Sequence, residues 1–249
     1  MTARQKIILA ICSFGAVIRV AASAPAPDTA ATTIEHMPTK LETEFALSAL
    51  PPALREHASV YRLDPKKGYQ LSREGTSGLT CLVERTAWEQ ADFRNDIYVP
   101  LCYDAAGTKT FLKVIMEVAT LRIQGMSPAA LKVEVESRYQ NKTYKAPERT
   151  GVSYMVAPVM RTWMLPDFQV HTMPMPHLMF YAPHLTDGDI GALPNSGITY
   201  PFMFKEGIAA QSYIVQMMGH AEIARIVADG KTLLADLCAY RDVLCLPKQ

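Results

Sequence analysis

Strand-forming runs alternate with turn-forming residues between positions 59 and 85, and this alternation restricts the possible folds more than any other feature. The runs SVYRL, YQLSRE and LTCLVER are separated by DPKKG and GTSG. Such spacing is typical of short antiparallel strands joined by tight turns. The sequence therefore predicts a β-meander, in which GTSG (75–78) is a hairpin turn rather than a phosphate-binding loop.

Further strands and several helices follow this meander. Strand character returns at Val99–Tyr103, 151–157, 163–170, 176–182 and 213–217. Apolar residues recur with helical spacing at 41–50, 109–124, 128–139 and 220–243, the last interrupted near Gly230. Strands with inserted helices, rather than strict alternation, favour an α+β fold with a mainly antiparallel sheet. We expect one domain over 41–217 and a C-terminal helical extension over 218–249.

The first 24 residues have the layout of a secretory signal peptide. Arg4 and Lys6 precede an apolar core at 7–18, and small residues follow at 21–24. We expect cleavage after Ala22 or Ala24 and a periplasmic or extracellular protein. Residues 25–40 are rich in Ala, Thr and Pro and are interpreted as a flexible leader. The apolar core is too short to span a bilayer, and no later stretch comes closer, so no transmembrane segment is expected after signal removal.

The charge balance excludes one class of partner. The chain has 25 basic and 24 acidic residues, and the signal region carries three basic residues and no acidic ones. Removing it leaves 22 basic against 24 acidic residues, a formal charge of −2. Nucleic-acid binding normally needs a strongly basic surface, so no nucleic-acid partner is expected.

Four cysteines remain after signal removal, and an even number in an oxidising compartment indicates disulfides. Cys81 and Cys102 each lie in an apolar, strand-like run, so their pairing would join neighbouring strands. Cys238 and Cys245 are seven residues apart, and their pairing would close a small loop after the last helix. For this second pair, two buried free thiols are the alternative.

The stretch 171–191 (HTMPMPHLMFYAPHLTDGDIG) concentrates histidine, methionine and aspartate. In an extended chain every second side chain points to the same face. Prolines at 174 and 176 restrict pairing to 176–182, where we expect Leu178, Phe180 and Ala182 to face the core. The other face could bind Cu(I) through thioether and imidazole groups, whereas core packing is the alternative. Its members are His171, Met173, Met175, His177, Met179 and Tyr181.

The end of this stretch suggests a second kind of metal site. His177, His184, Asp187 and Asp189 could hold a Zn(II) or Ca(II) ion that polarises an ester or lactone carbonyl. Their spacing matches no strong metal motif, and aspartates that cap the next turn are the alternative interpretation.

Nucleophilic catalysis has one candidate. Ser153 lies in GVSYM, which lacks the second glycine of a GxSxG elbow. Ser153 could act with His177 or His220, because catalytic triads assemble from residues distant in sequence. The candidate catalytic residues are Ser153, His177 and Asp187.

Four segments resemble the recurring blocks of a family of exported bacterial proteins without an assigned activity. They are REGTSGLTCLVE (73–84), LCYDAAG (101–107), GVSYM (151–155) and PHLMFYAPHLTDGDIG (176–191). The resemblance covers roughly residues 47–215 and implies export and a single domain. It assigns no catalytic residue.

Three functional hypotheses follow, and whether the protein is an enzyme stays open. The first is a binding or scaffolding protein of the cell envelope, whose partner is a small-molecule ligand or an envelope component. The second is a metal-assisted hydrolase of a small ester or lactone, and the third is a copper-handling protein.

Overall fold

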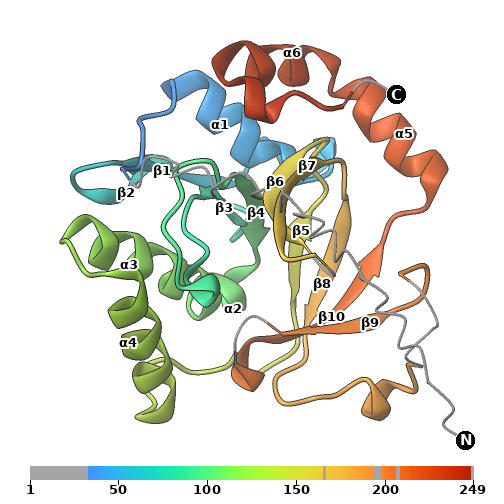
Figure 1. Ribbon diagram of the computed structural model, residues 1–249. Coiled ribbons are helices and arrows are strands. Elements are labelled where there is room, and N and C mark those ends of the chain that lie inside the picture. Colours follow the sequence, from blue (N-terminus) through green and yellow to red (C-terminus); the bar gives the residue numbers. More distant parts are fainter. Residues whose placement is uncertain (1–32, 165–166, 193–197, 206–207, 248–249) are drawn as a thin grey trace, which may run out of the picture.

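The strands form one large sheet and one separate hairpin. The computed structural model describes residues 33–164, 167–192, 198–205 and 208–247, so the predicted signal peptide lies outside the described residues. The large sheet has eight strands in the order β2-β1-β3-β4-β5-β8-β10-β9 (Figure 1). In this order they are Gly68–Arg73, Ser59–Asp64, Thr80–Glu84, Val99–Tyr103, Val152–Met155, His177–Tyr181, Ser212–Met217 and Phe202–Lys205. All neighbours pair antiparallel except β1 and β3, which are parallel.

The prediction of a β-meander is wrong in its strand order. β1 lies between β2 and β3, so the segment after β2 crosses to the far edge of β1 instead of turning back beside β2. Thr76 and Ser77 donate their backbone N–H groups to the His57 carbonyl, both at 2.9 Å. A Cβ on Gly75 would lie 2.3 Å from the same carbonyl oxygen. The GTSG segment is therefore a tightly packed crossover and not a hairpin turn.

Helices cover both faces of the sheet. Because the sheet is mostly antiparallel with one parallel pair, the predicted α+β class is confirmed in broad terms. In Figure 1, α1 and α6 lie above the sheet, α5 lies at the upper right, and α3 and α4 lie at the lower left. Thr110 and Gly125 flank α3. The boundary between α5 and α6 falls at Gly230, as predicted. The helices are α1 (Thr39–Ser48), α2 (Ala105–Thr108), α3 (Phe111–Ile123), α4 (Pro128–Gln140), α5 (His220–Asp229) and α6 (Lys231–Tyr240).

Each face of the sheet carries its own apolar core. On the α3 side, Phe111 and Ile115 pack against inward-facing residues of the strands, including Tyr103, Met179 and Tyr181. On the other side, α1 and α6 pack together over β1, β3 and β4. This second core contains Phe45, Leu50, Val60, Cys81, Val83, Cys102, Leu237 and Leu244. Residues of the predicted C-terminal extension therefore complete the core of the domain.

Two elements differ from the prediction. The expected strand over 163–170 instead spans a hairpin between β6 (Met160–Met164) and β7 (Gln169–Met173), in which Trp163 pairs with Val170. The expected flexible leader, 25–40, is packed where the structure describes it, because Ile34 is 5% and Met37 only 1% exposed. Each of the two side chains belongs to one of the cores, so the packed domain begins before residue 41.

Two disulfides join the predicted cysteine pairs. Cys81 and Cys102 face each other across β3 and β4, with their Cα atoms 4.0 Å apart. This separation is slightly below the usual range for a bridge, which begins at about 4.4 Å. Cys238 and Cys245 link α6 to the segment that follows it, with a Cα separation of 4.5 Å. Both bonds are consistent with an oxidising compartment.

None of the helices in the described part of the chain is both long and apolar enough to cross a bilayer.

Candidate functional site

The stretch 171–191 does not form the single face that the sequence predicted. His171 and Met173 lie on β7, which within the described ranges pairs only with β6 in the small hairpin. His177 begins β8 in the large sheet. Pro174 and Pro176 separate the two strands because neither residue can donate a hydrogen bond to a sheet. Met175 lies between these strands, so the six residues expected to share a face are divided between two sheets and their connecting segment.

The orientation predicted for β8 is also wrong. Met179 and Tyr181 are each only 2% exposed and His177 is 4% exposed, whereas Leu178 is half-buried and Phe180 is 40% exposed. Both sets of side chains are apolar enough to be buried. The α3 core seals one face of β8, whereas α5 covers the other face incompletely. The packing of distant helices thus decides which set faces inward.

His177 has a structural role. Its Nδ1 atom lies 2.7 Å from the carbonyl oxygen of Met175, two residues earlier. Burial lowers the pKa of the imidazole below its usual value, so the ring is neutral at physiological pH. A sealed, neutral histidine bonded to its own chain satisfies a local carbonyl, and it gives a substrate no polar surface to bind.

The residues of the predicted oxygen- and nitrogen-ligand site make separate contacts. The Asp187 carboxylate accepts a hydrogen bond from the backbone N–H of Met203 at 2.9 Å. Asp189 accepts hydrogen bonds from the N–H and the hydroxyl of Thr186. Among the described residues, no group of three or more His, Cys, Asp and Glu side chains could hold a metal ion. The predicted set of His177, His184, Asp187 and Asp189 is thus not assembled, and the turn-capping interpretation fits Asp189.

The other candidates are also dispersed. Ser153 is fully buried on β5, and its hydroxyl has no hydrogen-bond partner within the described ranges. The residue opposite Ser153 on β8 is Met179, whereas His177 faces Met155. His171 contacts Asp167, with Nε2 and Oδ2 2.8 Å apart, at the hairpin β6–β7. Met175 packs on the α3 core.

Three of the four segments that carry the predicted family resemblance meet at one polar centre. Asp104 begins α2 by accepting hydrogen bonds from the N–H groups of Ala106 and Gly107, both at 2.9 Å. Its second oxygen accepts from the Val152 N–H. The Tyr181 hydroxyl lies 3.0 Å from Asp104 Oδ1 and 2.9 Å from the Val152 carbonyl oxygen. The blocks LCYDAAG, GVSYM and PHLMFYAP thus join β4, β5 and β8.

Gly107 and Gly151, which belong to these blocks, lie so close to the polar centre that a larger residue would not fit. A Cβ on Gly107 would lie 2.1 Å from the Tyr181 hydroxyl oxygen, and one on Gly151 would lie 2.1 Å from an Asp104 oxygen. The two blocks therefore contain glycine because the polar centre leaves no space for a side chain. This packing explains the motifs without a catalytic role.

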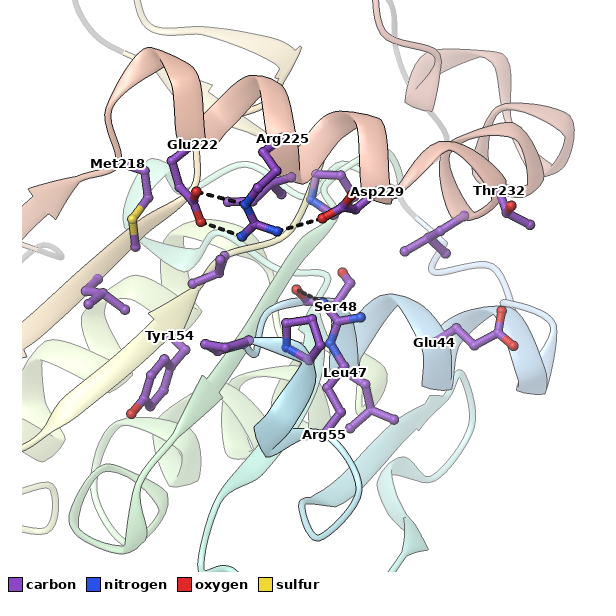
Figure 2. A pocket seen from close by; sticks show the side chains of 18 residues that line it. Glu44, Leu47, Ser48, Arg55, Tyr154, Met218, Glu222, Arg225, Asp229 and Thr232 are labelled. Atoms are coloured by element: carbon purple, nitrogen blue, oxygen red, sulfur yellow. Dashed lines mark hydrogen bonds and ion pairs between the residues drawn. The ribbon is translucent and has the colours of Figure 1, made fainter.

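An apolar pocket lies between α1, α5 and the outer face of β5 and β8. It has a volume of about 490 Å³, within the range of small-molecule sites. Tyr154 and Leu178 form a cross-strand pair on its floor. Leu47 and Met218 also line the pocket (Figure 2). The other apolar lining residues include Val156, Pro158, Ile226 and Leu233. We call this pocket the α1–α5 groove.

The groove exists because α5 packs loosely. Of the ten residues of α5, which the structure describes in full, only Ile226 is buried. The helix begins after Gly219, where a Cβ would meet no described atom within 4 Å, and it ends at Gly230. A Cβ on Gly230 would lie 2.8 Å from Pro158, so this glycine permits close contact with the groove wall. α5 is thus held at its C-terminal end and bridges the groove.

Charged groups line both edges of the groove, and they differ in how they are paired. On the α5 side, Arg225 forms ion pairs with Glu222 and with Asp229 (Figure 2). On the α1 side, half-buried Arg55 donates from Nε to the Leu50 carbonyl oxygen at 2.8 Å and lies beside Ser48. Among the described residues, no acidic side chain forms an ion pair with Arg55. Burial lowers the pKa of its guanidinium, which nevertheless stays protonated at neutral pH.

Sequence reasoning missed this groove because its residues come from four distant segments, 44–55, 154–158, 178 and 218–233. The one signal that could have drawn attention to it is the spacing of Ile223, Ile226 and Val227 on α5. This spacing gives the helix an apolar side, although the helix buries little of it.

A comparison with known proteins found no matching family model, no similar curated protein and no similar solved structure. The resemblance to exported bacterial proteins therefore stays a prediction.

Proposed function

We propose that this protein is a binding protein of the cell envelope that holds an amphipathic anion, such as a fatty-acid carboxylate, in the α1–α5 groove. The observation that carries the proposal is Arg55, a half-buried cation that no acidic side chain of the described residues pairs with, beside an apolar pocket. An anionic ligand would supply the missing counter-charge, while its apolar part would cover Tyr154 and Leu178.

The apolar surface continues beyond the groove, which supports a ligand with an elongated apolar part. Phe180 follows Leu178 on the same face of β8 and is 40% exposed. Its cross-strand neighbours are Val152 on β5 and Ile214 on β10. An exposed apolar strip next to a pocket is typical of a ligand-binding or partner-binding surface.

Calorimetric titration with dodecanoate and dodecanol tests the proposal, because the two probes share an apolar chain and differ in charge. We expect the protein to bind dodecanoate more tightly. Arg55→Met keeps most of the apolar stem, and it should weaken dodecanoate binding by at least about tenfold with little effect on dodecanol. Arg73→Met on the edge strand β2 is the matched control and should leave both affinities unchanged.

A second pair of variants tests the apolar floor. Leu178→Trp should fill the groove and abolish binding of both probes. Leu71→Trp places the same bulk on β2, at a residue that is 51% exposed, and should have no effect. Equal affinities of the two probes for the wild-type protein, or an unchanged dodecanoate affinity in Arg55→Met, would contradict the proposal.

The hydrolase and copper-handling hypotheses stay predictions. Metal analysis of the purified protein, followed by melts with Zn(II), Ca(II) and Cu(I), tests both. A native-state ligand at a hundredfold excess over Kd stabilises a protein by about 2.7 kcal/mol. The copper hypothesis requires a shift with Cu(I) that is lost in Met173→Leu/Met175→Leu. The hydrolase hypothesis requires a shift with Zn(II) or Ca(II). It also requires turnover of an ester or lactone that is lost in His177→Ala and in Asp187→Ala without loss of fold.

A further inference from the structure

A second cavity, which shares no lining residue with the α1–α5 groove, lies between α2, the first turn of α3 and the loop at 143–149. Its volume is about 670 Å³. The floor carries small or rigid residues, Ala105, Ala106, Ala146 and Pro147. We call this cavity the basic cleft, because four of its lining residues are cationic.

The charge of the basic cleft contrasts with the near-neutral balance of the whole chain. Its cations are Lys109, Lys113, Lys145 and Arg149, whereas Glu148 is its one acidic lining residue within the described ranges. Lys113 lies 3.6 Å from Glu117. Among the described residues, no ion pair engages Lys109, Lys145 or Arg149. The cleft therefore concentrates positive charge that the described part of the protein does not neutralise.

Nearby acids are already engaged by other groups. The Glu117 carboxylate accepts hydrogen bonds from Arg138 at 2.9 Å and from the Tyr144 hydroxyl at 2.7 Å. Asp104 accepts three backbone N–H bonds, from Ala106, Gly107 and Val152. These contacts hold both carboxylates in place, and Lys109, Lys145 and Arg149 stay outside the ion pairs of the described residues, whereas Lys113 lies beside Glu117.

The walls of the cleft are fixed although its cations are exposed. Tyr144 is 3% exposed and its ring packs on that of Tyr139, with centroids 5.3 Å apart. Pro147 is also buried, so the loop that presents Lys145 and Arg149 is packed on both sides. A fixed backbone lowers the entropy lost when a ligand is bound.

We propose that the basic cleft binds a small molecule with at least two phosphate groups. Three cations around one cavity, none of them in an ion pair within the described residues, match a ligand with several negative charges better than a monocarboxylate. Arginine forms bidentate hydrogen bonds with phosphate, and lysine contributes point charges. The site is separate from the α1–α5 groove and does not depend on the function proposed for it.

Inorganic pyrophosphate is the probe, titrated into the full protein at constant ionic strength. Lys145→Gln/Arg149→Gln should weaken its binding by more than about tenfold, because two charge-assisted contacts are lost. Lys66→Gln/Lys67→Gln removes the same net charge from the β1–β2 turn and should change the affinity less than about twofold, since distant charges are screened by salt. Thermal melts of both variants check that each is folded.

A second experiment, which measures binding to lipid vesicles, distinguishes a soluble ligand from a lipid headgroup. Binding to phosphatidylcholine vesicles that contain phosphatidic acid, with the same dependence on Lys145 and Arg149, would show that the recognised phosphate can be carried by a lipid. The proposal is overturned if pyrophosphate does not bind, whether or not these vesicles bind. It is also overturned if the two double variants lose affinity equally, because that result indicates unspecific attraction.

Discussion

At the residue scale, the most unusual group is the carboxyl of Glu42 on α1. It is 1% exposed, and Oε1 accepts a hydrogen bond from the Leu63 N–H at 2.8 Å. Its other oxygen has no hydrogen-bond partner in the described part of the chain. Burial raises the pKa of Glu42 from 4.5 to about 7, against the lowering effects of the Leu63 N–H and the nearby arginines. Asp96 shows the opposite balance, because hydrogen bonds from Arg94 and Arg161 outweigh burial and lower its pKa to about 2.

We therefore expect the contribution of Glu42 to stability to be lost as the pH rises from 4.5 to above 7. In this window the folded state keeps the Glu42 proton that the unfolded state loses, so the contribution of Glu42 to the free energy of unfolding decreases by roughly 3 kcal/mol. Glu42→Gln keeps an acceptor for Leu63 and should remove this decrease in urea unfolding measured across the window. Glu44→Gln, on the exposed side of α1, is the control. The same pH slope in Glu42→Gln and wild type would contradict the assignment.

At the scale of elements, β8 shows what a sequence can predict about a strand. Its position was predicted, because Pro176 and Pro183 bound a run of strand formers. The face of β8 that points into the core was predicted wrongly, because Leu178 and Phe180 are as apolar as Met179 and Tyr181. Which face of β8 is buried depends on the helices: α3 covers one face completely, whereas α5 covers the other face only in part. No local pattern contains that information.

Substitutions on this one strand should reveal the orientation. Met179→Ala empties a position in the α3 core and should lower the free energy of unfolding by about 2–5 kcal/mol. Phe180→Ala removes a larger side chain from the partly exposed face, and it should cost about 1 kcal/mol or less. Urea denaturation measures both values. A greater loss for Phe180→Ala would show that the orientation of β8 is reversed.

At the scale of the whole molecule, the sequence predicted the fold class and both disulfides but neither the strand order nor the groove. The strand order depends on the crossover segment GTSG (75–78). Its composition resembles that of a turn. The groove depends on contacts among segments that are distant in the chain, such as Leu47 on α1 and Ile226 on α5. Pairing of Cys81 with Cys102 was predictable because both cysteines lie in strand-like runs.

The predicted C-terminal extension should be required for folding, because α6 and the segment after it supply buried residues to the second core. Leu237 and Leu244 are both 0% exposed. A chain that ends at Met218 lacks both, and loss of two such residues approaches the total stability of a typical domain. We expect this variant to lose its near-UV circular dichroism and its cooperative unfolding. A chain that ends at Leu246 should fold normally, and cooperative unfolding of the shorter chain would contradict the prediction.

The contact between the earliest and latest described segments also sets the order of events during synthesis. The Tyr240 hydroxyl donates to the carbonyl oxygen of His36, 204 residues earlier, and Arg241 lies 3.4 Å from Glu35. During synthesis α1 emerges from the ribosome long before α6. The apolar side of α1 therefore has no α6 to pack against while most of the chain is made. During that interval the nascent chain stays accessible to holding chaperones, and the layer over β1, β3 and β4 closes only after translation has passed Leu244.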